Sequence, residues 1–318
     1  MQKIINLGML FFIGLTACTT TSELPTRAVA AIVPPILTVT PTPPPTPQVT
    51  STQTPQPTAT PQPSPTPPPT PCTSPGRIET GFFNSAAGGQ MAYRIYLPPC
   101  YGENGRTYPT LYMLPGNNQT DAIWDSLGLD ETAEQAIQND EIPPQIIVMP
   151  EGGWIALNSS GGSFSYESVI MDDLIPFIET TYCAWSDPAG RAIGGLSRGG
   201  YWALEIAFRH AEQFASVGGH SASLYDIAAG PDLNPQHTGL THNLGQLRIY
   251  LDIGENDSGI GNTRKLHEDL TAQEIPHTWV LNQGGHDNAY WSAHLREYLD
   301  WYSAGWPSIN DLPPTCIK

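Results

Sequence analysis

From residue 72 onward, short runs of apolar residues alternate with longer runs in which apolar residues recur every three or four positions. The short runs predict strands and the longer ones predict amphipathic helices. The strand candidates are residues 77–84, 91–97, 108–114, 145–149, 191–194, 214–217, 247–253 and 278–281. The helix candidates are residues 129–138, 167–182, 201–210, 263–273 and 289–302.

The order of these elements predicts an α/β fold. The first two strand candidates flank a turn at Gly88 and Gly89, which is typical of an antiparallel hairpin. The later strands are separated by helices, so we expect a mainly parallel central sheet with helices on both faces. Residues 72–318 are long enough for one large domain of this kind.

The N-terminal residues are typical of an export signal. Lys3 precedes an apolar run, residues 4–17, that is too short to cross a bilayer permanently. Ala17 and Cys18 resemble the end of a bacterial lipobox, which predicts a lipoprotein signal peptide over residues 1–17 and lipidation of Cys18. An ordinary secretory signal is the alternative. Both interpretations predict an exported protein, and the first predicts a cell-surface or periplasmic lipoprotein whose membrane contact is the lipid anchor.

Residues 18–71 are rich in proline, threonine, serine and glutamine. Of the 33 prolines in the chain, 18 lie between Thr19 and Pro75. Such a composition cannot bury a core and favours an extended, polyproline-like conformation. We therefore expect a disordered tether between the anchor and the folded domain.

Four cysteines remain when Cys18 is set aside: Cys72, Cys100, Cys183 and Cys316. An even number in an exported protein predicts two disulfides, with three possible pairings. Cys72 precedes the first strand of the predicted hairpin and Cys100 follows the second, and these two ends lie side by side in a hairpin. This favours Cys72 with Cys100, which leaves Cys183 to pair with Cys316.

The charge and the histidines exclude several classes of partner. A formal net charge of -17 argues against nucleic acid or another polyanion as a ligand, because both need cationic contacts. His220, His237 and His242 lie in a polar stretch, residues 218–246, but their spacing fits no usual ligand pattern and no paired thiol accompanies them. We expect neither a metal nor a cofactor. The polarity of that stretch also argues against a large apolar lid.

The motif that carries the chemistry is Gly195, Leu196, Ser197, Arg198, Gly199. It follows a strand candidate and opens a helix candidate, which is the setting of a nucleophile elbow. Glycines two positions before and after the serine permit a very tight turn in which larger side chains would collide. We therefore predict that Ser197 is a nucleophile.

A serine nucleophile of this fold needs an acid and then a histidine further along the chain. Asp257 lies just beyond the strand candidate 247–253 and is favoured as the acid over Asp252, within that strand, and over Glu255. His286 follows Gly284 and Gly285 in the loop after the last strand and is favoured as the base. The other downstream histidines, His267, His277 and His294, fall in or beside helices and strands, where packing accounts for them.

The attacked carbonyl also needs N–H donors for its developing negative charge. The backbone N–H of Arg198, at the start of a helix, is one candidate. The other is expected from the loop after the strand 108–114, where we favour the N–H of Asn117 because Pro115 has none.

Several motifs in order resemble the esterase family of the α/β-hydrolase superfamily that includes feruloyl esterases, S-formylglutathione hydrolases and antigen 85 mycolyltransferases. The similarity is greatest to bacterial feruloyl esterase domains, and it covers nearly all of residues 95–302. It is carried by segments 111–116, 146–150, 173–177, 195–199, 254–258 and 283–287, together with Trp124 and Trp291. The resemblance implies an α/β-hydrolase fold and the same triad of Ser197, Asp257 and His286.

Two residues depart from the family pattern. Pro115 stands where relatives usually have histidine, and Arg198 stands where they often have methionine. Arg198 is a candidate to meet a substrate carboxylate, but we favour an internal salt bridge, to Asp172 or Asp173, for its side chain.

Together these features predict a serine carboxylic ester hydrolase that forms an acyl-enzyme, acting on feruloyl or acetyl esters of plant polysaccharide. Trp124, Trp154, Tyr166 and Trp291 are candidates to stack on a phenolic acyl group or a sugar. Core packing is the alternative role for each. An acyltransferase with the same triad and a non-catalytic carbohydrate-binding lipoprotein are the alternative functions.

Overall fold

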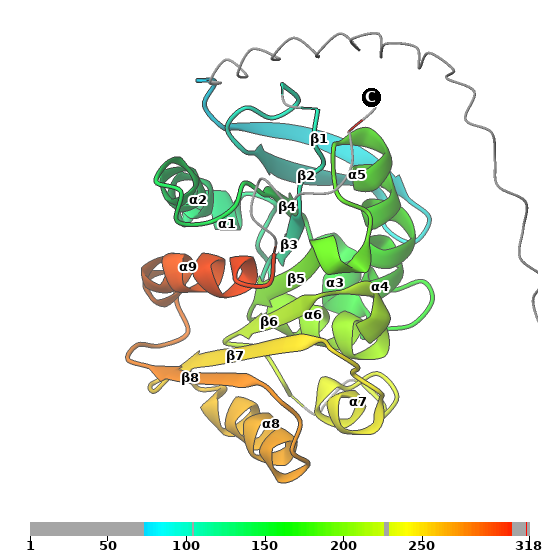
Figure 1. The fold of residues 1–318 in the computed structure, drawn as a ribbon. Coiled ribbons are helices and arrows are strands. Elements are labelled where there is room, and N and C mark those ends of the chain that lie inside the picture. The colour runs from blue at the N-terminus through cyan, green and yellow to red at the C-terminus, as the bar shows by residue number, and fades with distance from the viewer. Residues whose placement is uncertain (1–72, 104, 226–228, 307–315, 317–318) are drawn as a thin grey trace, which may run out of the picture. The chain divides into compact units, whose positions relative to one another are not determined.

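The computed structural model describes residues 73–103, 105–225, 229–306 and 316. The predicted signal peptide, Cys18 and the predicted tether lie outside these residues. Within them, the strands form a sheet of eight in the order β1-β2-β4-β3-β5-β6-β7-β8 (Figure 1). The strands are β1 Arg77–Ser85, β2 Gly89–Leu97, β3 Thr110–Leu114, β4 Ile146–Pro150, β5 Arg191–Leu196, β6 Ser216–His220, β7 Arg248–Gly254 and β8 Thr278–Asn282.

The first two strands are antiparallel to their neighbours and the rest of the sheet is parallel. β1 pairs with β2 in a hairpin, and β2 pairs antiparallel with β4. From β4 across to β8, each neighbouring pair is parallel. The predicted α/β-hydrolase arrangement, a mainly parallel sheet with an antiparallel N-terminal hairpin, is confirmed.

Helices connect the parallel strands. The α-helices are α1 Ile123–Ser126, α2 Leu129–Gln138, α3 Gly153–Asn158, α4 Tyr166–Ser168, α5 Ile175–Thr181, α6 Arg198–Arg209, α7 Pro235–Thr241, α8 Ile260–Ala272 and α9 Asn288–Ser303. A π-helical stretch, Val169–Leu174, joins α4 to α5, and 3-10 turns occupy Pro188–Gly190 and Ala211–Gln213.

The sheet separates two hydrophobic cores. Because side chains alternate along a strand, Leu111 and Met113 of β3 face one core while Tyr112 and Leu114 face the other. The first core is closed by α2 and α9, which lie side by side in Figure 1. The second is closed by α5, α6 and α8. Helices therefore cover both faces of the sheet, as the sequence predicts.

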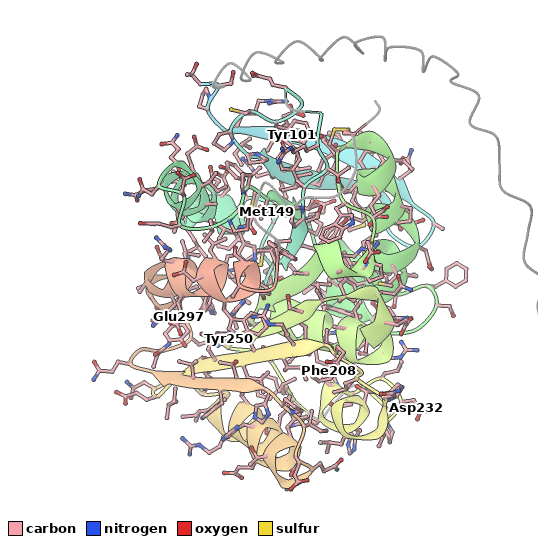
Figure 2. The ribbon with its side chains drawn as sticks, viewed as in Figure 1. Tyr101, Met149, Phe208, Asp232, Tyr250 and Glu297 are labelled. Carbon is pink, nitrogen blue, oxygen red and sulfur yellow. A yellow bond between two sulfur atoms is a disulfide. The ribbon has the colours of Figure 1, made fainter. Side chains whose placement is uncertain are left out.

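A side-chain hydrogen bond links α9 to β7. The Tyr250 hydroxyl on β7 donates a hydrogen bond to Glu297 Oε1 on α9, at 2.7 Å (Figure 2). None of the helices described combines the length and the apolar character that crossing a bilayer requires.

One predicted disulfide is present between described residues. Cys183 and Cys316 are bonded, with 5.4 Å between their Cα atoms. Cys100 is also disulfide-bonded, and its predicted partner Cys72 lies outside the described residues.

Candidate active site

The site forms at the edge of the sheet where neighbouring parallel strands end. β5 ends at Leu196, directly before Ser197. Asp257 lies in the turn after β7, and His286 lies in the loop between β8 and α9. Since the carboxyl ends of parallel strands share one edge, three residues far apart in sequence come together there.

The backbone at Ser197 has the strained conformation of a tight strand-to-helix turn. Its φ of 54° and ψ of -117° are rare for a residue with a side chain. A Cβ added at Gly199 would come within 2.3 Å of the Leu114 carbonyl oxygen, and one at Gly195 within 2.4 Å of the Gly199 backbone. Glycine is required at both positions by this close approach, which is the steric reason expected from the motif.

Hydrogen bonds connect Ser197, His286 and Asp257 in a chain. His286 Nε2 lies 2.8 Å from Ser197 Oγ, and His286 Nδ1 lies 2.7 Å from Asp257 Oδ2. Asp257 also accepts the Gly259 N–H on Oδ1, at 2.7 Å. With Nδ1 donating to the carboxylate, Nε2 is the ring nitrogen that accepts the serine proton.

The carboxylate is sheltered while the imidazole remains accessible. The Asp257 side chain has no exposed area, whereas 34% of the His286 side chain is exposed. Burial by itself raises the pKa of Asp257, but the hydrogen bonds from His286 and the Gly259 N–H outweigh it and lower the pKa overall. Asp257 is therefore an anion at neutral pH, next to the imidazole that it orients.

The other candidates for the acid and the base make different contacts. Asp252 is fully buried and its Oδ1 lies 2.7 Å from Nδ1 of His220, not of His286. Glu255 is exposed. His267 and His277 bond to each other at 2.7 Å, and His294 Nδ1 donates to the Tyr290 carbonyl, also at 2.7 Å.

The two residues predicted to supply N–H donors lie close to Ser197. Arg198 is the first residue of α6, so its N–H has no carbonyl in a preceding helical turn. Asn117 lines both of the pockets that adjoin Ser197.

The side chain of Arg198 does not make the salt bridge that we favoured. Its Nε donates to the Ala156 carbonyl at 3.1 Å and an Nη donates to the Ser159 carbonyl. Asp173 instead accepts the Ala86 N–H, at 3.2 Å. The predicted salt bridge is wrong because the guanidinium donates instead to backbone carbonyls at α3 and directly after it.

Two pockets adjoin Ser197. The first has a volume of about 580 Å³ and is lined by Asn117, Leu157, Asn158, Ser159, Ser160, Ser197, Arg198, Ser223 and Tyr225. The second, of about 530 Å³, is lined by Gly116, Asn117, Asn118, Gln119, Ser197, His286, Asp287, Asn288 and Trp291. We call them the Arg198 pocket and the His286 pocket. Each has a volume typical of a small-molecule site.

The four predicted stacking aromatics have different positions. Trp124 and Tyr166 are completely buried and line neither pocket, so the expectation that they contact substrate is wrong. Trp124 donates to the Leu114 carbonyl and Tyr166 to the Glu151 carbonyl, which identifies both as structural. Trp154 is 73% exposed but lines neither pocket. Trp291 lines the His286 pocket and packs edge-on against the His286 ring, 5.1 Å between centroids.

Sequence reasoning missed Ser223. Its Oγ lies 3.1 Å from Ser197 Oγ, and its backbone N–H donates to the Ser197 carbonyl at 2.9 Å. It lies in the polar stretch after β6, where a single serine has no distinguishing pattern. The pairing of β5 with β6 brings it beside the elbow, a contact between distant segments that local patterns do not reveal.

Comparison with known proteins places the chain in a family. The family model described as "Putative esterase" matches residues 84–302, which include Ser197, Asp257 and His286. The chain belongs to this esterase family. Part of it, 148 residues, is 36% identical to the esterase Rv1288 of Mycobacterium tuberculosis, covering 44% of this chain and 31% of that protein.

Other similar proteins have lower sequence identity to this chain. Over 153 residues the chain is 30% identical to an endo-1,4-beta-xylanase/feruloyl esterase of Xylanibacter ruminicola, covering 45% of this chain and 21% of that protein. The chain thus spans less than a third of the length of either curated relative. Among solved structures, a ferulic acid esterase is similar with a TM-score of 0.66 and 22% identity, covering 74% of this chain and all of that one. The S-formylglutathione hydrolase of Staphylococcus aureus has a TM-score of 0.61 and 15% identity, covering 72% and 100%. These two likenesses support the α/β-hydrolase fold.

Proposed function

We propose that this protein is a carboxylic ester hydrolase in which Ser197 is the nucleophile, His286 the general base and Asp257 the acid that orients it. The observation that carries the proposal is the hydrogen-bond chain of 2.8 Å and 2.7 Å through the three side chains. Membership of the esterase family supports the reaction class.

The chemistry follows from the positions of the atoms. Ser197 Oγ attacks the ester carbonyl carbon while its proton passes to His286 Nε2. The N–H groups of Arg198 and Asn117 stabilise the carbonyl oxygen as it becomes negative. The carbon–oxygen bond to the alcohol then breaks, and Nε2 gives its proton to the departing oxygen. His286 Nε2 then takes a proton from water, whose oxygen attacks the acyl carbon; the bond to Ser197 Oγ breaks, Nε2 returns the proton to Oγ, and the free acid leaves.

For the substrate we propose feruloyl or acetyl esters of plant polysaccharide. The support is a relative named as a feruloyl esterase and the two open pockets beside Ser197. For the setting we propose a lipoprotein anchored through Cys18, with residues 18–71 as its tether and residues 72–318 as its catalytic domain. The support is the sequence pattern of the N-terminal segment.

Hydrolysis of methyl ferulate and 4-nitrophenyl acetate tests the reaction. The wild-type domain should release ferulate or acetate, and Ser197→Ala should lower kcat/KM by about 10⁴-fold or more. Product transferred to an added sugar or alcohol, in place of free acid, would identify an acyltransferase. Full activity in Ser197→Ala would refute the mechanism, and a folded protein inactive on every ester would favour the binding-protein alternative.

A further inference from the structure

The two pockets divide the substrate into an acyl side and an alcohol side. This step rests on the proposed function, in which His286 returns a proton to the departing alcohol. The alcohol oxygen must then lie within reach of Nε2, and His286 lines only one of the two pockets. The alcohol part therefore occupies the His286 pocket, which leaves the Arg198 pocket for the acyl group.

Among the described residues that line the Arg198 pocket, Arg198 is the one with a formal charge. The other lining residues are asparagine, serine, leucine and tyrosine, all neutral at pH 7. This positive charge contrasts with the formal net charge of the whole chain, which is -17.

Among the described residues, the groups in direct contact with the guanidinium are neutral. It donates to the carbonyls of Ala156 and Ser159, and its Cζ lies 4.5 Å from the Tyr201 ring centre and 5.1 Å from that of Trp202. Within the part of the chain that the structure describes, no carboxylate lies within ion-pair distance of it. A guanidinium has five N–H donors, and these contacts use two of them.

Burying a cation is costly unless an anion pairs with it, and among the described residues Glu205 acts on Arg198 through space without forming an ion pair. Burial lowers the pKa of Arg198, because removing the guanidinium from water destabilises its charged form. The fixed planar group, already oriented by two carbonyls and two rings, is suited to bind a carboxylate without losing further rotational freedom. Leu157 and Tyr225, which are 40% and 47% exposed, give the same pocket apolar surface for a short chain.

We propose that the Arg198 pocket selects acyl groups that carry a carboxylate at their far end, so that hemi-esters of dicarboxylic acids are preferred substrates. The carboxylate pairs with the Arg198 guanidinium while the ester carbonyl lies at Ser197. A feruloyl group can also enter, because its phenol and methoxy oxygens accept hydrogen bonds, but a carboxylate is the stronger acceptor.

Matched esters test the selectivity directly. The mono-4-nitrophenyl esters of succinic, glutaric and adipic acid are each compared with the corresponding terminal amide, after subtraction of the rate measured with Ser197→Ala. The chain length that places the carboxylate on Arg198 should give the acid a kcat/KM about tenfold to a hundredfold above its amide. Arg198→Met and Arg198→Gln should bring this ratio close to one, and Arg198→Lys should keep part of it.

A second pair of esters tests which side carries the carboxylate. For 4-acetoxybenzoate and 4-acetoxybenzamide, whose charge is on the departing phenol, we expect a ratio near one in the wild type. A ratio near one for every dicarboxylic pair, an undiminished ratio in Arg198→Met, or a preference for 4-acetoxybenzoate would overturn the inference. Equal loss on acid and amide in a folded Arg198→Met would assign the side chain a purely structural role. Absence of hydrolysis of all these esters by the wild type would instead refute the proposed function, and this inference with it.

Discussion

Two hydroxyl groups meet at the centre of the site. Ser197 has one proton, which it donates to His286 Nε2 across 2.8 Å. The contact of 3.1 Å between Ser197 Oγ and Ser223 Oγ therefore needs the Ser223 hydroxyl as its donor. That bond fixes the rotamer of the nucleophile before substrate arrives.

Ser223→Ala should lower kcat/KM about fivefold, because it removes one neutral hydrogen bond. Steady-state kinetics on 4-nitrophenyl acetate measures the effect. Ser126→Ala, an exposed serine on α1, is the matched control and should leave the rate unchanged. An unaltered rate in Ser223→Ala would show that the contact has no part in positioning Ser197.

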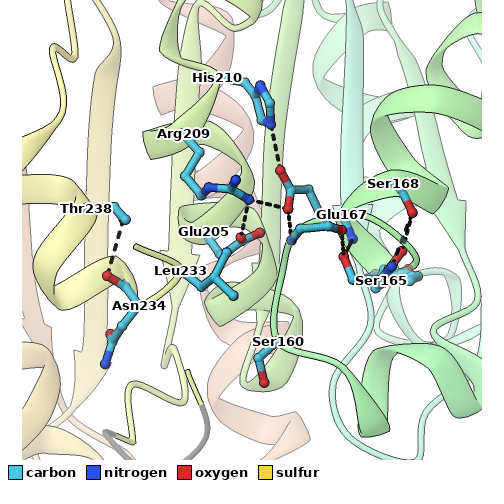
Figure 3. Close-up of polar contacts among 12 residues, drawn as sticks. Ser160, Ser165, Glu167, Ser168, Glu205, Arg209, His210, Leu233, Asn234 and Thr238 are labelled. Carbon is cyan, nitrogen blue, oxygen red and sulfur yellow. Dashed lines mark hydrogen bonds and ion pairs between the residues drawn. The ribbon is translucent and has the colours of Figure 1, made fainter. Parts of the chain in front are cut away.

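At the scale of elements, a partly buried cluster of polar side chains lies between α6 and the segment formed by residues 159–167. Arg209 on α6 bonds to both Glu167 and Glu205, and His210 Nε2 lies 2.7 Å from Glu167 Oε1 (Figure 3). The segment approaches so closely that a Cβ added at Gly161 would come within 2.1 Å of Glu205 Oε1. Ser159 and Ser160 of the pocket belong to this segment.

This cluster should make stability depend on pH through Glu205. Burial, with the nearby Glu167 carboxylate, raises the pKa of Glu205 well above its usual value. The folded protein therefore keeps a proton that the unfolded chain loses above about pH 4.5, and stability falls as pH rises from there to the raised pKa. Glu205→Gln stays neutral, so its Tm relative to wild type should be more favourable at pH 8 than at pH 5.

Thermal unfolding at the two pH values measures this difference. Glu212→Gln, which changes an exposed carboxylate in the 3-10 turn after α6, is the matched control and should follow the wild type at both. Parallel pH profiles for Glu205→Gln and wild type would contradict the assignment.

The elements show where sequence patterns suffice. Strand and helix candidates with strong periodicity match the structure within a few residues, and α2, Leu129–Gln138, matches at both ends. The helix expected over residues 167–182 is instead α4, a π-helical stretch and α5, because the widened turn is a local hydrogen-bond change with no apolar signature. The short helices α1, α3 and α7 were missed because runs of four to seven residues contain too few turns to show a period.

The catalytic triad could be predicted from the sequence, but the roles of several residues around it could not. Ser197, Asp257 and His286 could be singled out because chain order and turn positions restrict the choices, and the structure brings them together. Trp124 and Tyr166 could not be separated from binding aromatics, since a sequence does not tell whether a large ring faces a pocket or a core. The carbonyl partners of Arg198 depend on backbone orientation, which residue types leave undefined.

At the scale of the whole molecule, the bond between Cys183 and Cys316 links residues 133 positions apart. Cys183 follows α5, and its carbonyl accepts the Tyr108 N–H just before β3. The disulfide therefore lies at the amino ends of the strands, away from Ser197.

The double variant Cys183→Ser, Cys316→Ser should lose about 2–4 kcal/mol of stability, a fall in Tm of about 4–16 °C. Activity at 25 °C should remain, and calorimetry with an ester assay checks both. Loss of activity from a folded double variant would contradict this separation.

Labelling with a fluorophosphonate probe tests the central claim most directly, because the probe reacts with an activated serine without requiring the natural ester. The account predicts one adduct per chain, mapped by peptide mass spectrometry to the peptide that contains Ser197. The adduct should be absent in Ser197→Ala and form far more slowly in His286→Ala, with both variants folded. An adduct on another serine, or none on the folded wild-type protein, would contradict the assignment of Ser197 as the nucleophile.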